Sequence, residues 1–145
     1  MKPFRLDSIL DYRKRLEDIA QNRLSEAKRQ QELVQKKLTS ETQQLSILIN
    51  KTEELQSKPI SILDLINYEN RITYSKNNIE AIRKKLSEKN EILDRERLHL
   101  LEKSRDRKIL EKLKTQQNAS WKQYLDKKEM AMLDEIAIVK HKSDR

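Results

Sequence analysis

The sequence predicts an all-α fold in which two long helices form an antiparallel coiled-coil hairpin, with the second helix longer than the first. Three observations support this prediction. The 145 residues contain no glycine and only two prolines, Pro3 and Pro59. Charged residues make up 39% of the chain and aromatic residues 4%, a composition typical of long helices with little core. Apolar residues also recur at heptad spacing. Without glycine, positive φ angles are costly, so tight strand hairpins and glycine-rich phosphate loops are not expected.

The first helix is expected over about residues 3–56. It begins near Pro3, because proline is favoured in the first turn of a helix. Two apolar series, one at each of the two core positions of a heptad repeat, then run along it. They comprise Ala20, Ala27, Val34, Leu48 and Leu55 at one position and Leu10, Leu24, Leu38 and Leu45 at the other.

The turn is expected at residues 57–61, around Pro59. Proline has no amide donor and its ring clashes with the preceding turn, so a continuous helix is not expected to pass through it. A start signal follows, because Ser61 can cap the amide groups of a new helix and Asp64 lies near its positive end. The chain therefore folds back at this point.

The second helix is expected over about residues 62–140. Six successive heptad positions carry an aliphatic residue: Leu65, Ile72, Ile79, Leu86, Leu93 and Leu100. The next positions in this series are Arg107, Lys114 and Trp121. At about 1.5 Å per residue, the first helix ends opposite a point near residue 115 of the second. We therefore expect a single hairpin over residues 1–145, in which residues 116–145 lack an intramolecular partner and form a binding surface.

Residues for catalysis, cofactors and metals are not apparent. His99 and His141 have no neighbour at ligand spacing, and the chain has no cysteine. A two-helix hairpin also offers no desolvated pocket that could separate the pKa values of two carboxyl groups. We expect no enzymatic activity, no cofactor and no metal site.

Membrane insertion and specific nucleic-acid binding are not expected either. No apolar run approaches the roughly 20 residues that span a bilayer, and residues 1–7 lack the apolar core of a secretory signal, so a cytoplasmic location is expected. The net charge is +8, but both signs are interspersed. The most basic stretch, residues 103–114, has no aromatic residues on which bases could stack.

The chain resembles the FliJ family, the small coiled-coil component of the bacterial flagellar type III export apparatus. The similarity covers nearly the whole chain in length and plan, and its motifs are short. They lie at the start (Phe4, Leu6, Ile9, Leu10, Tyr12, Arg13 and Glu17), in the interior (Ile66-Asn67-Tyr68) and near the end (Trp121–Asp126, Lys128, Glu129 and Leu133–Ala137).

The resemblance implies an antiparallel coiled coil similar to the stalk of the ATP synthase γ subunit. It also implies a cytoplasmic protein, held peripherally at the inner membrane of the flagellar base. Three partners follow from it: the ring of the export ATPase FliI, the membrane export-gate protein FlhA, and export chaperones that the protein recycles.

Candidate site residues follow from the resemblance. Those for the ATPase ring are Phe4, Leu6, Arg13, Trp121, Tyr124, Asp134 and Glu135. Those for the export gate, by position in the half of the hairpin near the turn, are Gln44, Leu48, Ile72, Ser75 and Ile82.

Most of these candidates also have a structural interpretation. Phe4 and Leu6 could equally be simple end packing, and Asp134 and Glu135 could form a solvated face. Leu48, Ile72 and Ile82 could equally be core residues, and Trp121 and Tyr124 could pack against a helix. Two other functions stay open on the sequence alone: a generic coiled-coil scaffold, and a basic helical protein associated with nucleic acid.

Overall fold

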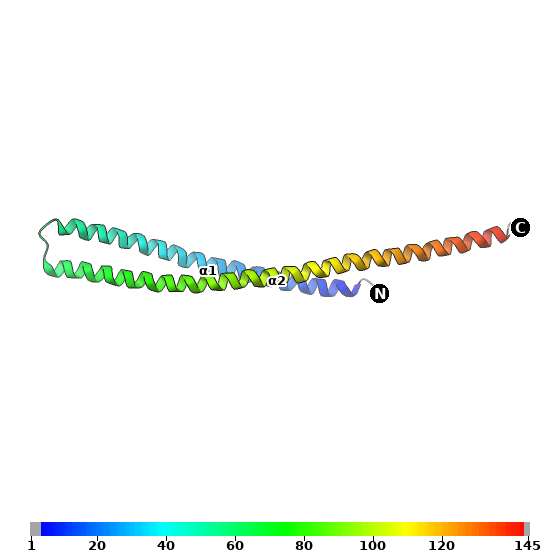
Figure 1. Ribbon diagram of the computed structural model, residues 1–145, viewed down its shortest axis with the longest axis horizontal. Coiled ribbons are helices and arrows are strands. Elements are labelled where there is room, and N and C mark those ends of the chain that lie inside the picture. The colour runs from blue at the N-terminus through cyan, green and yellow to red at the C-terminus, as the bar shows by residue number, and fades with distance from the viewer. Residues whose placement is uncertain (1–3, 144–145) are drawn as a thin grey trace. The chain divides into compact units, whose positions relative to one another are not determined.

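A computed structural model describes the backbone of residues 4–143 and the side chains of residues 5–142. Within this range the chain forms two helices, α1 (Phe4–Gln56) and α2 (Ile62–Ser143), joined by one turn (Figure 1). The predicted all-α hairpin with a longer second helix is confirmed. Pro3, the expected start of the first helix, lies outside the described residues.

The turn is built from side-chain and backbone hydrogen bonds, without any positive φ angle among the described residues. At the end of α1, the amides of Ser57 and Lys58 donate to the carbonyl oxygens of Glu54 and Leu55, both at 3.3 Å. These bonds satisfy carbonyl groups that the helix end leaves without a partner. At the start of α2, the amide of Asp64 donates to the Ser61 hydroxyl at 3.1 Å, as the predicted cap requires.

Residues 21–99, here called the turn unit, form one of two compact units. Its centre is apolar, because residues at the predicted heptad positions face the other helix. Within this unit the aliphatic heptad residues of the second helix, from Leu65 to Leu93, are buried or half-buried, as are those of the first. The most buried members of the turn unit are Ala27, Val34, Ile79, Ile82 and Leu93.

One polar residue, Thr52, is also buried in the turn unit. Its hydroxyl donates to the carbonyl oxygen of Leu48 at 2.8 Å, so the burial leaves no hydroxyl proton without a partner.

Residues 1–20 and 100–145, here called the end unit, form the second compact unit. Within it, the start of α1 packs antiparallel on α2. The buried apolar residues are few, and the two deepest are Leu10 and Ala20, the latter fully buried at 0% exposure. This seam therefore depends on polar contacts more than the seam of the turn unit does.

Three ion pairs join the two helices within the end unit. Arg13 donates to Asp106 at 3.0 Å, Arg107 to Glu17, and Lys114 pairs with Asp7. The Glu17 carboxylate, with help from Glu111 on α2, raises the pKa of Arg107. Asp7 likewise raises the pKa of Lys114. The charges at the heptad positions of Arg107 and Lys114 are therefore paired across the seam.

Candidate functional site

The turn unit carries a groove of about 800 Å³ between its two helices. Three of the five sequence candidates for the export gate, Gln44, Leu48 and Ser75, line this groove. Sequence reasoning did not single out the other lining residues for this role. They are Glu41, Asp64, Asn67, Tyr68, Asn70, Arg71, Tyr74 and Asn78.

The walls of the groove combine amide, charged and aromatic side chains. The guanidinium of Arg71 lies over the ring of Tyr68, 5.5 Å from its centroid, which holds the arginine in a cation–π contact. Tyr74 is 75% exposed. Each of the asparagines offers both a donor and an acceptor, so the groove can hydrogen-bond to the backbone of a bound polypeptide.

Two gate candidates lie in the helix seam rather than on the groove. Ile72 is half-buried and Ile82 is buried, at 6% exposure. Both occupy core positions of the heptad repeat, so their side chains are committed to packing α2 against α1.

The end unit has a second hollow, of about 610 Å³, lined by Leu113, Gln116, Gln117, Ser120, Trp121 and Tyr124. The rings of Trp121 and Tyr124 stack with centroids 5.6 Å apart and planes at 26°. Trp121 is half-buried and Tyr124 is exposed. The two sequence candidates thus form one aromatic surface.

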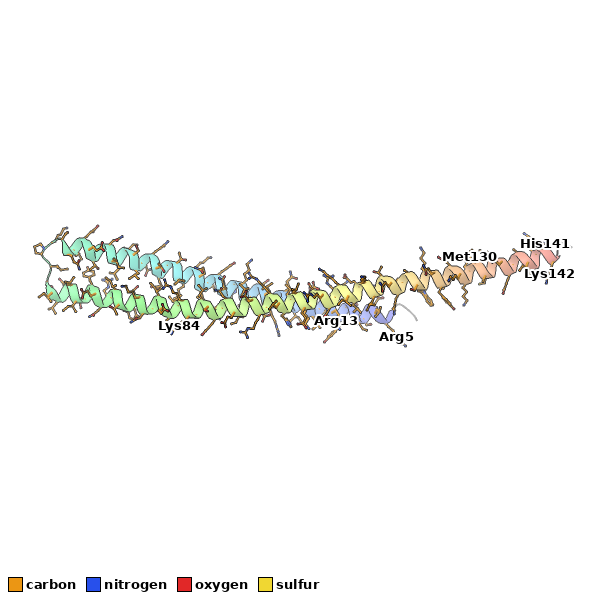
Figure 2. All side chains as sticks on the ribbon, in the orientation of Figure 1. Arg5, Arg13, Lys84, Met130, His141 and Lys142 are labelled. Carbon is orange, nitrogen blue, oxygen red and sulfur yellow. The ribbon has the colours of Figure 1, made fainter. Side chains whose placement is uncertain are left out.

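Residues 122–142 of α2, here called the uncovered segment, are all exposed. In the end unit α2 continues past the start of α1, and the labelled side chains of Met130, His141 and Lys142 stand on this part (Figures 1 and 2). The segment nevertheless carries many large apolar residues: Leu125, Met130, Met132, Leu133, Ile136, Ile138 and Val139. A helix with this much exposed apolar surface is typical of a binding site for another protein.

The ring candidates on α2 are not all on one side of the helix. At 100° per residue, Trp121, Tyr124 and Glu135 lie within about 60° of one another. Asp134 lies about 140° from Trp121 around the helix. Glu135 therefore shares the face of Trp121 and Tyr124, and Asp134 lies off that face.

The ring candidates on α1 are at the start of the hairpin. Leu6 is half-buried, and Arg13 is engaged by Asp106 in the ion pair described above. α1 begins at Phe4, whose side chain lies outside the described part of the chain.

The described residues hold no cluster of three or more histidine and acidic side chains that could bind a metal ion. Nor does any helix within residues 4–143 have the length and apolar character needed to cross a membrane.

Two long helices, with a groove in the turn unit and an exposed apolar segment in the end unit, define a coiled-coil protein. Comparison with protein families agrees, since the family model described as "Flagellar FliJ protein" matches residues 1–145. The chain belongs to the FliJ family, and by that membership it is a non-enzymatic component of the flagellar protein export apparatus. No curated protein and no solved structure gave a significant match.

Proposed function

We propose that this protein binds the ring of the export ATPase with the ends of its hairpin, as a stalk, and couples the ring to the export gate. The observation that carries the proposal is the uncovered segment, which exposes apolar side chains along about 20 residues of helix. Burial of such surface is the main driving force for protein association. Trp121 and Tyr124 are residue types that often dominate binding energy at interfaces.

The gate contact belongs to the groove of the turn unit in this proposal. The groove combines exposed Tyr74, the oriented Arg71 and several amide side chains, a mixture suited to a polypeptide partner. Gln44, Leu48 and Ser75 contribute directly. Ile72 and Ile82 act through the fold, because they hold the helices that form the walls.

The protein works in this proposal on the cytoplasmic side of the inner membrane, held at the flagellar base by its partners. Recycling of export chaperones is part of the same proposal, and it rests on family membership alone. Two binding experiments test the ATPase contact and the gate contact separately.

Replacing both Trp121 and Tyr124 by alanine should weaken binding to the cognate export ATPase by at least about tenfold, as loss of aromatic anchors at an interface does. Co-sedimentation with the ATPase measures this. Asp126→Ala is the matched control, because Asp126 is exposed on the same helix about 140° from Trp121 and about 160° from Tyr124, and this variant should bind normally. Equal binding by all three proteins would place the ring contact elsewhere.

Replacing Arg71 and Tyr74 by alanine should weaken binding to the cytoplasmic part of the cognate export-gate protein by roughly tenfold. Isothermal titration calorimetry measures the affinity. Arg83→Ala serves as the control, since Arg83 is exposed, pairs with Glu80 of its own helix and does not line the groove. If Arg83→Ala weakens binding as much as the groove substitutions do, the loss of affinity reflects the loss of positive charge and not the groove.

A further inference from the structure

The face of α2 that packs against α1 in the end unit continues along the uncovered segment. Leu100, Arg107, Lys114 and Trp121 follow at seven-residue steps, and each is half-buried. Past Trp121 the seven-residue series continues with the charged residues Lys128 and Glu135, and beside them the same side of the helix carries Leu125, Met132, Ile136 and Val139, all within about 60° of helix circumference. These four are between 44% and 65% exposed. The side of α2 that could pack against a second helix therefore extends beyond the point where α1 begins.

We propose that a second copy of this chain covers that seam, so that two molecules pair antiparallel through their uncovered segments when no other partner is bound. This proposal goes beyond the ATPase contact, because it assigns an occupant to the same face in the free protein.

Charge complementarity selects the second copy and its register. Lys128 and Glu135 are seven residues apart and lie on one edge of the seam. In an antiparallel pair, equivalent edges of the two helices face each other, so Lys128 of each copy can meet Glu135 of the other. A shift of one heptad either way places Lys128 opposite Lys128 or Lys142. Only the first register pairs opposite charges, and two-fold symmetry makes the pair twice.

The apolar residues agree with this register. Leu125 of one copy lies opposite Ile136 of the other, again twice. Val139 lies beside Lys122, whose methylene groups can cover it while the ammonium group reaches water. A parallel, in-register pair would instead stack Glu129 on Glu129 and Lys122 on Lys122. The antiparallel pair avoids both repulsions.

The length of α1 leaves room for the second copy. α1 begins at Phe4, and the pairing of Asp7 with Lys114 places that start before Trp121 on α2. Residues 122–139 are therefore free of α1, and they give about 27 Å of helix for pairing.

One feature keeps the pair reversible. Glu129 falls in the middle of the seam, beside Met132 of the second copy, and a polar residue at a core position lowers coiled-coil stability. We expect a dimer that dissociates at roughly micromolar concentration, as a short seam with a polar core position does, and that the export ATPase displaces.

Sedimentation equilibrium of the full chain tests the proposal. At low ionic strength the mass should rise with concentration from 17.4 kDa toward twice that value. Lys128→Glu and Glu135→Lys should each weaken the dimer by about tenfold, because each puts like charges opposite each other twice. The double variant, and an equimolar mixture of the two single variants, should restore association. A monomer at every concentration, or a dimer indifferent to these charges, would overturn the proposal.

Orientation is tested with a short thiol crosslinker, since the natural chain has no cysteine. Leu125→Cys should crosslink to Ile136→Cys in a mixture but not to itself, whereas efficient self-linking of Leu125→Cys would contradict the antiparallel pair. The dimer proposal and the ATPase proposal can fail independently of each other. Co-sedimentation of the natural chain with the ATPase measures ATPase binding whether or not the chain dimerises. ATPase binding by a strictly monomeric chain would overturn the dimer alone.

Discussion

Replacing Ile82 by alanine is expected to lower the free energy of unfolding by about 3 kcal/mol, the usual cost of truncating a buried isoleucine. Ile82 is 6% exposed and belongs to the apolar core of the turn unit. The loss combines the transfer free energy of the removed methylene and methyl groups with the cost of the space they leave. Urea denaturation followed by circular dichroism at 222 nm measures it.

Tyr74→Ala provides the matched control in the same unit. Its side chain is 75% exposed, so the change in unfolding free energy should stay within about 0.5 kcal/mol. The pair of variants separates fold from function, because Tyr74→Ala should impair gate binding without loss of stability. A destabilisation by Ile82→Ala no larger than that of the control would mean that the helices do not pack through this position.

Reversing the charge of Arg107 is expected to open the end unit while the turn unit stays paired. Arg107 is 23% exposed and its partner Glu17 is 19% exposed, so both charges are partly shielded from water. Arg107→Glu would bring a third carboxylate beside Glu17 and Glu111. Loss of a hydrogen-bonded charged partner costs about 1–3 kcal/mol, and few apolar contacts compensate in this seam.

Hydrogen–deuterium exchange resolves this effect along the chain. Amides of residues 5–20 should exchange faster in Arg107→Glu, while those around Val34 and Ile79 should keep their protection. Adding Glu17→Arg restores an opposite charge across the seam and should recover much of the protection. Uniformly faster exchange in both units would instead indicate global destabilisation, and no change would show that the ion pairs contribute nothing.

Much of the fold could be predicted from the sequence, because its signals are local. Pro59 cannot continue a helix, and Ser61 supplies the cap that the next helix needs. The heptad series from Leu65 to Leu100 marks the face of α2 that turns inward, and those residues are buried or half-buried.

The ion pairs of the end unit could not be predicted in the same way. Arg107 and Lys114 looked like breaks in an apolar series, since their partners Glu17 and Asp7 are about 90 to 107 positions away in the chain. Only the antiparallel pairing of the two helices brings them together.

The candidate sites were predictable in part. Position along the hairpin indicated Gln44, Leu48 and Ser75, which line the groove. It could not separate Ser75 from Ile82, because the two residues occupy the same heptad position seven residues apart, and only the structure shows that Ser75 lines the groove and Ile82 is buried. The polar stripe of Asn67, Arg71, Tyr74 and Asn78, at steps of four, three and four residues, is a signal in the sequence that would have indicated the groove.

ATP hydrolysis by the cognate flagellar export ATPase, titrated with this protein, tests whether the uncovered segment engages the ATPase ring. Stimulation should rise to a plateau with the full chain and be lost with a chain that ends at Gln117, which lacks Trp121, Tyr124 and the uncovered segment. If the full chain neither changes hydrolysis nor co-sediments with the ATPase, or if the shortened chain stimulates equally, the uncovered end is not the contact through which this protein engages the ring.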